Sequence, residues 1–211
     1  MILAEPIQVT QLIAKVFDRL QIPYLVGGSL ASSLHGIPRA TQDVDMVAGL
    51  KPQHVTPFVK ALEAAFYIDA DMIQEAIQHG SSFNVIHLDT MFKIDIFVLK
   101  DDPASREEMK RGELYKVSEE SEQGLFLATA EDIILRKLYW FQLGGGSSER
   151  QWNDVLGVLQ VQKEKLDYSY LQRGAHQHPN GIKKFANQCP FHHAGTRIFR
   201  QFIGGSIPHS C

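Results

Sequence analysis

Two aspartates separated by one residue inside an apolar run constrain this chain more than any other feature. Asp43 and Asp45 flank Val44, and this alternation predicts a strand in which both carboxylates point to the same side. At about 3.3 Å of rise per residue, their Cα atoms would lie roughly 6.6 Å apart, close enough to share divalent cations. A third acid, Asp95, stands in the apolar run KIDIF at 93–97. Because an unpaired charge in such a strand is costly, the three carboxylates together predict a metal site.

Small residues precede the aspartate pair. Gly28 and Ser29 follow the short apolar run YLV at 24–26, and a helix is expected to begin directly after them. Backbone amides at a helix N-terminus bind phosphate, and the Ser29 hydroxyl adds another polar group. Carboxylates in this arrangement suit two Mg²⁺ ions, with Mn²⁺ as a substitute. The three segments therefore predict metal-dependent phosphoryl or nucleotidyl transfer.

Hydrophobic periodicity places these segments among alternating helices and strands. Apolar residues at helical spacing predict helices near residues 9–20, 55–66, 71–79, 129–143 and 152–159. Strands are expected at 24–26, 43–47, 82–88 and 91–99. The last two form a hairpin, whereas the polar residues 101–124 contribute one short helix that begins at Asp102. Trp140 and Trp152 are assigned to the hydrophobic core because both fall at helical spacing.

The amino-acid composition limits the classes of protein to which this chain can belong. Of the 211 residues, 44% are hydrophobic and 21% are charged, which is typical of one globular domain or one domain with a small appendage. No apolar run approaches the roughly 20 residues that a membrane helix needs, so no membrane partner is expected. The start of the chain lacks the features of a signal peptide. Two cysteines make no disulfide framework, and a reduced cytoplasmic setting is expected.

Charge is distributed unevenly along the chain. Residues 1–125 hold 18 acidic and 11 basic side chains, whereas residues 126–211 hold 6 and 10. An acidic half suits metal ions, and a basic half suits a polyanionic acceptor such as RNA. A chance asymmetry between solvated surfaces would give the same counts, and the sequence leaves both interpretations open.

The Gly28-Ser29 turn, a gap of thirteen residues and the aspartate pair together resemble the signature of the DNA polymerase beta-like nucleotidyltransferase superfamily. The run RATQDVD at 39–45 is similar to the Arg-x-Thr-x-Asp-x-Asp pattern of many small bacterial members. The segments SFNVI and KIDIF resemble the third-aspartate hairpin of AbiEii-type toxin nucleotidyltransferases. The resemblance covers about residues 8–171.

The resemblance implies an α/β (α+β) fold, in which a mixed β-sheet is flanked by helices and followed by a helical C-terminal part. It implies a nucleotidyltransferase catalytic domain over residues 1–125 and a helical part over 126–171 that completes the site. Residues 172–211 depart from the leucine-rich continuation of the relatives and are expected to form an irregular tail. The tail contains both cysteines and five of the nine histidines, in a spacing that matches no familiar zinc finger.

Three further residues are candidates for nucleotide binding. In toxin-like relatives the helical part supplies a lysine and an acid, and Lys137 and Asp154 stand at plausible matching places. Lys137 would contact the triphosphate, and Asp154 would orient Lys137 or the base. The alternative is ordinary surface charge, with Arg150 and Asp154 paired along one helix. Arg39 either binds phosphate or braces its loop by pairing with an acid.

These features imply an enzyme that moves a nucleoside monophosphate from an NTP to a hydroxyl acceptor. Asp43 and Asp45 would bind both metal ions, and Asp95 would bind one of them and help to deprotonate the acceptor. The acceptor would be RNA, a protein side chain or a small molecule. The alternative is a nucleotide- or partner-binding module of a toxin–antitoxin-like pair with little catalytic turnover. The sequence contains no indication of an oligomeric state.

Overall fold

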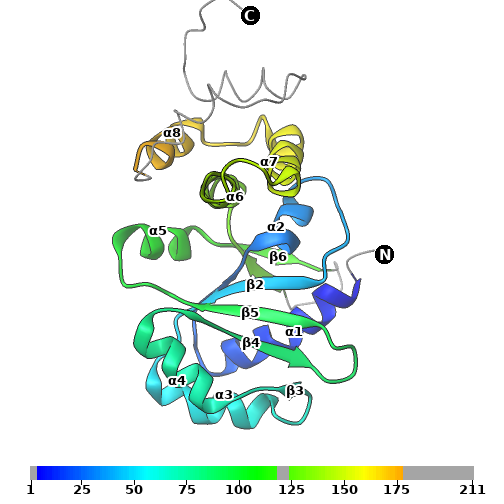
Figure 1. Cartoon of the computed structure of the whole chain (residues 1–211), viewed down its shortest axis with the longest axis vertical. Helices are drawn as coiled ribbons and strands as arrows, with labels where there is room; N and C mark the ends of the chain where they lie inside the picture. Colours follow the sequence, from blue (N-terminus) through cyan, green and yellow to red (C-terminus); the bar gives the residue numbers. More distant parts are fainter. Residues whose placement is uncertain (1–3, 118–123, 178–211) are drawn as a thin grey trace, which may run out of the picture. The chain divides into compact units, whose positions relative to one another are not determined.

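A computed structural model describes residues 4–117 and 124–177 of the chain (Figure 1). Its helices are α1 (Ala4–Arg19), α2 (Gly28–His35), the 3-10 turn η1 (Pro52–His54), α3 (Val55–Leu62), α4 (Ala70–His79), α5 (Pro103–Arg111), α6 (Ala130–Leu143), α7 (Glu149–Gln162) and α8 (Tyr168–Gln177). Its strands are β1 (Tyr24–Val26), β2 (Asp43–Ala48), β3 (Phe66–Tyr67), β4 (Ser82–His87), β5 (Lys93–Val98), β6 (Glu113–Lys116) and β7 (Gly124–Leu127). These elements form two compact units. Of the described residues, the first unit contains 4–34, 38–117 and 124–129, and the second contains 35–37 and 130–177.

The first unit is built on one mixed sheet. Its seven described strands lie in the order β3-β4-β5-β2-β1-β7-β6. The central pair β2 and β5 is parallel, as is the pair β1 and β7, whereas the other neighbours are antiparallel. Non-consecutive strands lie side by side at the centre, so segments far apart in the sequence share one surface.

The alternation of buried and partly exposed residues along β2 and β5 shows which side of the sheet faces the hydrophobic core. In both strands every second residue is buried and the residues between are partly exposed. The buried side chains face the core that contains α1, α3 and α4, which lie together on one side of the sheet (Figure 1). Phe17 of α1 and Phe58 of α3 stack there with ring centroids 5.1 Å apart. The opposite side of β2 and β5 carries their four charged residues together with Val47 and Phe97.

Three helices make up the described part of the second unit. Phe141 of α6 packs against Trp152 of α7, with ring centroids 5.5 Å apart. Residues 35–37 belong to this unit because the Gln162 side chain donates a hydrogen bond of 2.7 Å to the His35 carbonyl. Helix α8 runs to Gln177, past residue 172 where the irregular tail was expected to begin, and residues 178–211 lie outside the described part. No helix in the described ranges combines the length and apolar character needed to cross a bilayer.

The predicted fold class is confirmed: the structure is a mixed sheet flanked by helices with a helical C-terminal part. Some details differ. Phe66 was expected to end a helix but begins β3, where it pairs with His87, because α3 already ends at Leu62. Trp152 is buried as predicted, whereas Trp140 was wrongly assigned to the core and is 52% exposed. Strands β6 and β7 were not predicted, and they pair with each other at one edge of the sheet.

Candidate active site on the central sheet

Four charged side chains lie on the polar face of β2 and β5. The parallel register sets Asp43 opposite Lys93 and Asp45 opposite Asp95. All four positions are partly exposed, while the residues between them are buried. The structure therefore brings the three predicted carboxylates to one face of the sheet, and it adds a lysine to them. We call these four residues the carboxylate array.

Lys93 is the member of the array for which sequence analysis gave no role. Its Nζ lies 2.7 Å from Oδ2 of Asp95. The hydrogen bond to Asp95 raises the pKa of Lys93, and the negative charges of Asp95, Asp43 and Asp45 raise it further. The available signal was its place two residues before Asp95, which puts both side chains on one face. The ion pair lies within β5, and the parallel pairing with β2 brings Asp43 and Asp45 beside it.

Gly27 and Gly28, at the start of α2, bring the backbone close to the array. Gly27 N donates a hydrogen bond of 2.8 Å to the carbonyl of Asp45. Gly28 has a left-handed backbone, with φ of 56°, and a Cβ at this position would overlap the Asp45 carboxylate. A glycine is therefore required here for two reasons, the backbone angle and the close approach to Asp45.

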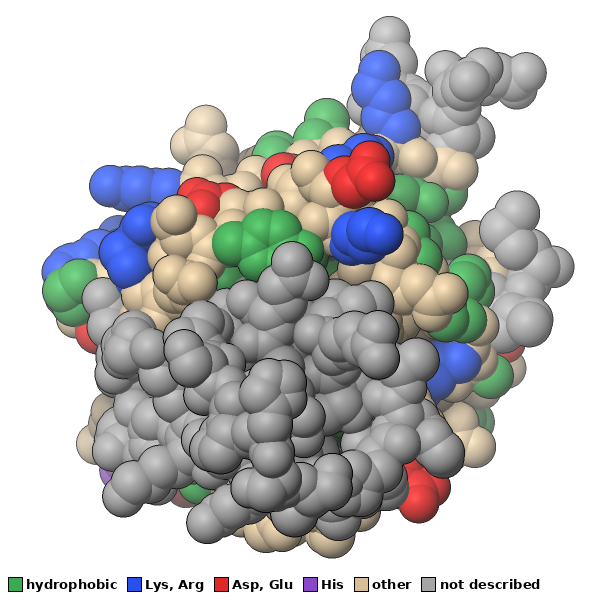
Figure 2. Space-filling model, turned by 90° about the horizontal axis from the view of Figure 1, so that it is seen from above, with side chains coloured by type: hydrophobic (Ala, Val, Ile, Leu, Met, Phe, Trp, Pro, Cys, Tyr) green, Lys and Arg blue, Asp and Glu red, His purple; other side chains and the backbone are tan. Residues whose placement is uncertain are grey.

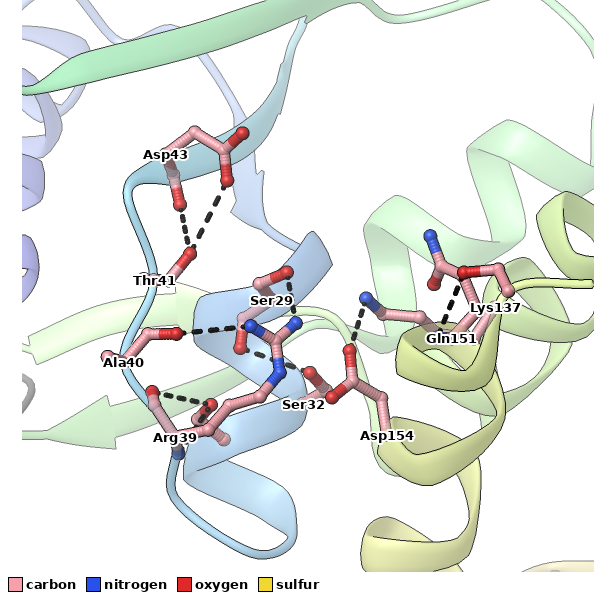
Figure 3. A network of polar contacts seen from close by, with 11 residues as sticks. Ser29, Ser32, Arg39, Ala40, Thr41, Asp43, Lys137, Gln151 and Asp154 are labelled. Carbon is pink, nitrogen blue, oxygen red and sulfur yellow. Dashed lines mark hydrogen bonds and ion pairs between the residues drawn. The ribbon is translucent and has the colours of Figure 1, made fainter.

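Arg39 braces the loop between α2 and β2. One guanidinium nitrogen, Nη2, donates a 2.7 Å hydrogen bond to the Ser29 hydroxyl, and Nη1 donates a 3.1 Å bond to the Ala40 carbonyl (Figure 3). Thr41 continues this network, since its hydroxyl donates to the Asp43 carbonyl at 2.7 Å. Of the two interpretations of Arg39, the contacts with the Ser29 hydroxyl and the Ala40 carbonyl support bracing of the loop. The same contacts place a guanidinium beside Ser29, at the N-terminal end of α2.

Lys137 and Asp154 form a buried ion pair within the second unit. Lys137 Nζ of α6 lies 2.8 Å from Oδ2 of Asp154 of α7, and both side chains are less than a tenth exposed (Figure 3). This direct contact between the two side chains agrees with the prediction that Asp154 orients Lys137. The expected alternative was a surface pair with Arg150, but the burial of Asp154 does not fit a merely surface charge.

The donor set of the array suits a hard divalent cation, because Mg²⁺ and Mn²⁺ prefer carboxylate oxygens. The arrangement is not a finished metal centre. Among the described residues, no three acidic, histidine or cysteine side chains are placed to hold one ion. Asp95 is engaged by Lys93, and its carboxylate would have to exchange that ammonium for a metal.

A cavity of about 500 Å³ lies near the starts of β2 and β5. Its walls include Thr41 and Gln42, which directly precede Asp43, and Thr90 and Phe92, which lie just before Lys93. The first turn of α1 completes the lining with Ala4, Glu5 and Pro6, and the last lining residue is Met91. The cavity therefore lies at the end of the sheet where Asp43 and Lys93 begin their strands.

Comparison with solved structures finds the same fold in other proteins. An antigenic nucleotidyltransferase-like protein from Paracoccidioides brasiliensis aligns with a TM-score of 0.57 over 86% of this chain and 85% of its own, at 16% sequence identity. The chain thus has a nucleotidyltransferase-like fold. The antibiotic-resistance factor ANT(2'')-Ia, in complex with adenylyl-2''-tobramycin, aligns with a TM-score of 0.50 over 88% of this chain and 99% of its own, at 13% identity.

Because the sequence identities are low, these similarities establish the fold and nothing beyond it. No protein-family model matches the chain, and no curated protein is similar enough to match. The AbiEii-type subgroup stays a prediction.

Proposed function

We propose that the protein is a metal-dependent nucleotidyltransferase that moves a nucleoside monophosphate from an NTP to a hydroxyl acceptor. The observation that carries the proposal is the array itself, in which Asp43 and Asp45 of β2 lie beside Asp95 of β5 on the polar face of a nucleotidyltransferase-like sheet. A partner-binding module would have no need for three carboxylates concentrated on one face, since their mutual repulsion is unfavourable.

In the proposed reaction the acceptor oxygen forms a bond to the α-phosphorus, the bond from that phosphorus to the bridging oxygen breaks, and pyrophosphate leaves. Asp43, Asp45 and Asp95 would hold two Mg²⁺ or Mn²⁺ ions, and these would stabilise the entering and leaving oxygens. Asp95 would help to take the hydroxyl proton. Gly28 and Ser29 would offer the backbone amides at the start of α2 to the phosphates, and Arg39 would add positive charge beside them.

The proposed site also includes Lys137 and Asp154, which would support binding of the triphosphate. The pair is buried and hydrogen-bonded within the second unit, which fixes the position of the Lys137 ammonium. We propose that this ammonium acts on the triphosphate as a point charge and that Asp154 orients it.

We further propose that the acceptor is a small molecule that carries a hydroxyl group. ANT(2'')-Ia, a solved structure with this fold, is in complex with adenylyl-2''-tobramycin, whose acceptor part is a small molecule. An open hollow of about 500 Å³ also lies at the starts of β2 and β5, although no member of the array lines it. An RNA acceptor would favour a continuous basic surface. On the face that Figure 2 shows, some described lysine and arginine side chains gather at one edge, and the others lie apart among acidic and hydrophobic ones.

A transfer assay tests the proposal. The full chain is incubated with each of the four NTPs labelled at the α-phosphate, with Mg²⁺ or Mn²⁺, and with separate pools of small metabolites, RNA and protein from a cell extract. We expect label in the small-molecule pool and release of pyrophosphate, both abolished by EDTA. Asp43→Asn and Asp45→Asn are expected to reduce transfer at least about 10³-fold, because each removes a proposed metal ligand.

The matched control is Asp89→Asn, which makes the same chemical change at an exposed position in the turn between β4 and β5. This variant is expected to transfer label at the unaltered rate. Equal labelling by Asp45→Asn and the unaltered protein would reject the proposed function. Label found in the RNA or protein pool alone would retain the transferase and reject the small-molecule acceptor.

A further inference from the structure

We propose that Lys93 competes with the divalent cation for Asp95 and thereby sets the metal concentration at which the active site assembles. This inference rests on the proposed function, because it assigns a role at the same site. It makes Lys93 a positioning residue, which acts through Asp95 rather than on the substrate.

The first step of the argument is the register of the two central strands. Lys93 is directly opposite Asp43, and Asp95 is directly opposite Asp45, on parallel strands. Residues two apart on a strand point to the same face, so the lysine lies on the same side as all three acids. Its other strand neighbour is Ile86 of β4, which carries no charge. Acidic residues therefore lie beside Lys93 on β2 and along β5, and none lies opposite it on β4.

The second step is the contact that the ammonium makes. Lys93 Nζ and Asp95 Oδ2 are 2.7 Å apart, and the two side chains are 43% and 23% exposed. Partial exposure allows this pair to open without a large penalty, unlike a buried pair. Asp43 and Asp45 add negative charge around the ammonium. Lys93 is thus a monovalent counter-ion supplied by the chain itself.

The third step is what the contact does to metal binding. Asp95 is engaged by the Lys93 ammonium, and among the described residues no three acidic, histidine or cysteine side chains are placed to hold one ion. A metal that takes Asp95 as a ligand must first displace the ammonium, and it then has a positive charge as its neighbour. Both effects weaken metal binding. Removal of the ammonium therefore strengthens it.

The same reasoning gives an opposite effect on the metal-free protein. Without the ammonium, three carboxylates face one another on adjacent strands, and like charges at this separation repel. Lys93→Met is expected to lower the melting temperature measured in EDTA. Addition of Mn²⁺ is expected to raise it by more than it raises that of the unaltered protein.

Isothermal titration of the full chain with MnCl₂ at fixed ionic strength tests the inference without reliance on activity. We expect Lys93→Met to bind Mn²⁺ about 10-fold more tightly than the unaltered protein. Lys93→Arg keeps the positive charge and is expected to bind within about two-fold of it. Lys60→Met makes the matched change at an exposed lysine of α3, and its Mn²⁺ affinity is expected to be unaltered. Circular dichroism checks that each variant is folded, and Lys93→Gln replaces Lys93→Met if that variant is not.

The outcomes separate this inference from the proposed function. Mn²⁺ affinity that is equal in Lys93→Met and the unaltered protein, or weaker in the variant, overturns the role of Lys93 and leaves the transferase intact. If neither folded protein binds Mn²⁺, the metal-dependent function is itself rejected, and the role of Lys93 is rejected with it.

Discussion

Gly28 and Gly80 have nearly the same left-handed backbone, with φ of 56° and 58°, in very different surroundings. A Cβ on Gly80 would meet nothing within 4 Å, whereas a Cβ on Gly28 would overlap the Asp45 carboxylate. Gly80→Ala is therefore expected to lower the unfolding free energy by about 1–2 kcal/mol, the backbone cost alone, and to leave transfer activity unchanged. Gly28→Ala incurs the same backbone cost and also displaces Asp45.

We expect Gly28→Ala to destabilise the protein more than Gly80→Ala does, and to lower transfer activity about 10²-fold or more because a metal ligand is misplaced. Urea denaturation gives the two free energies, and the assay with labelled NTP gives the two rates. If both variants lose equal stability and keep full activity, the close approach of Gly28 to Asp45 has no functional importance.

Tyr24 is a residue whose ionisation links folding to alkaline pH. Burial raises the pKa of Tyr24 to about 12, and the negative charge of Asp18 adds to the shift. Above pH 10 the unfolded chain loses this proton while the folded protein keeps it, so stability falls as the pH rises from about 10 to 12. Below pH 10 the contribution of the neutral form is fully present.

Tyr24→Phe removes the ionisable hydroxyl and keeps the ring contacts with Phe17 and Phe126. We expect the unfolding free energy of this variant to fall less steeply between pH 10 and 12 than that of the unaltered protein. Urea denaturation at several pH values measures both slopes. Identical slopes would show that Tyr24 does not ionise differently in the folded and unfolded chains.

Among the helices, α6 and α7 are joined by the buried ion pair between Lys137 and Asp154. Removal of one partner from such a pair leaves the other charge in a poorly solvated position, which typically costs 3–5 kcal/mol. Lys137→Met is therefore expected to destabilise the protein by about that amount. The double variant Lys137→Met with Asp154→Leu removes both charges and is expected to recover most of the loss.

A double-mutant cycle from urea denaturation measures the coupling between these two residues. A coupling near zero would mean that the pair contributes nothing specific to the packing of α6 on α7. The double variant also tests the catalytic role. If it recovers stability and full transfer activity, Lys137 does not act on the triphosphate.

At the level of elements, the sequence was informative wherever a periodic pattern coincided with burial. Strict alternation predicted β2 and β5, and Gly80 correctly marked the end of α4. It was uninformative where no side of an element is buried. Every residue of β6 is exposed, so no hydrophobic pattern predicts this strand. It forms through its pairing with β7.

Phe66 shows the opposite difficulty, since its buried side chain lies four residues after Leu62 and so continues the helical pattern. Pairing with His87 in the sheet decides its conformation instead. Local periodicity cannot distinguish these two ways of burying one ring. The same limit explains Trp140, which fits the spacing of α6 but lies on its exposed side.

Across the whole molecule, the candidate site depends on a strand order that no local pattern contains. Spacing predicted that Asp43 and Asp45 share a face, because both lie on one strand. That Asp95 stands opposite Asp45, and Lys93 opposite Asp43, follows from the parallel pairing of β2 with β5. The cost of an unpaired charge in an apolar strand gave the expectation for Asp95, and the resemblance to a family added to it. Neither gave an expectation for Lys93, whose contact with Asp95 is seen in the structure.

Ligand binding at the array should be measurable as stability of the entire protein. A ligand that binds only the folded state at 100 times its Kd adds about 2.7 kcal/mol to the unfolding free energy. For a chain of this length each kcal/mol raises Tm by about 2–4 °C. With Mg²⁺ and a non-hydrolysable NTP at that excess, we therefore expect Tm to rise by roughly 5–10 °C. EDTA is expected to abolish the rise because the triphosphate is held partly through the metal.

Two aspartate variants distinguish a ligand bound at the array from one bound elsewhere. Asp45→Asn removes a carboxylate from the polar face of β2 and is expected to show no rise in Tm under the same conditions. Asp89→Asn makes the same change in an exposed turn and is expected to show the full rise. Differential scanning calorimetry measures all three proteins in one buffer. A full rise in Asp45→Asn would mean that the nucleotide stabilises the protein from a site that does not use the array, and would contradict its assignment as the metal and nucleotide site.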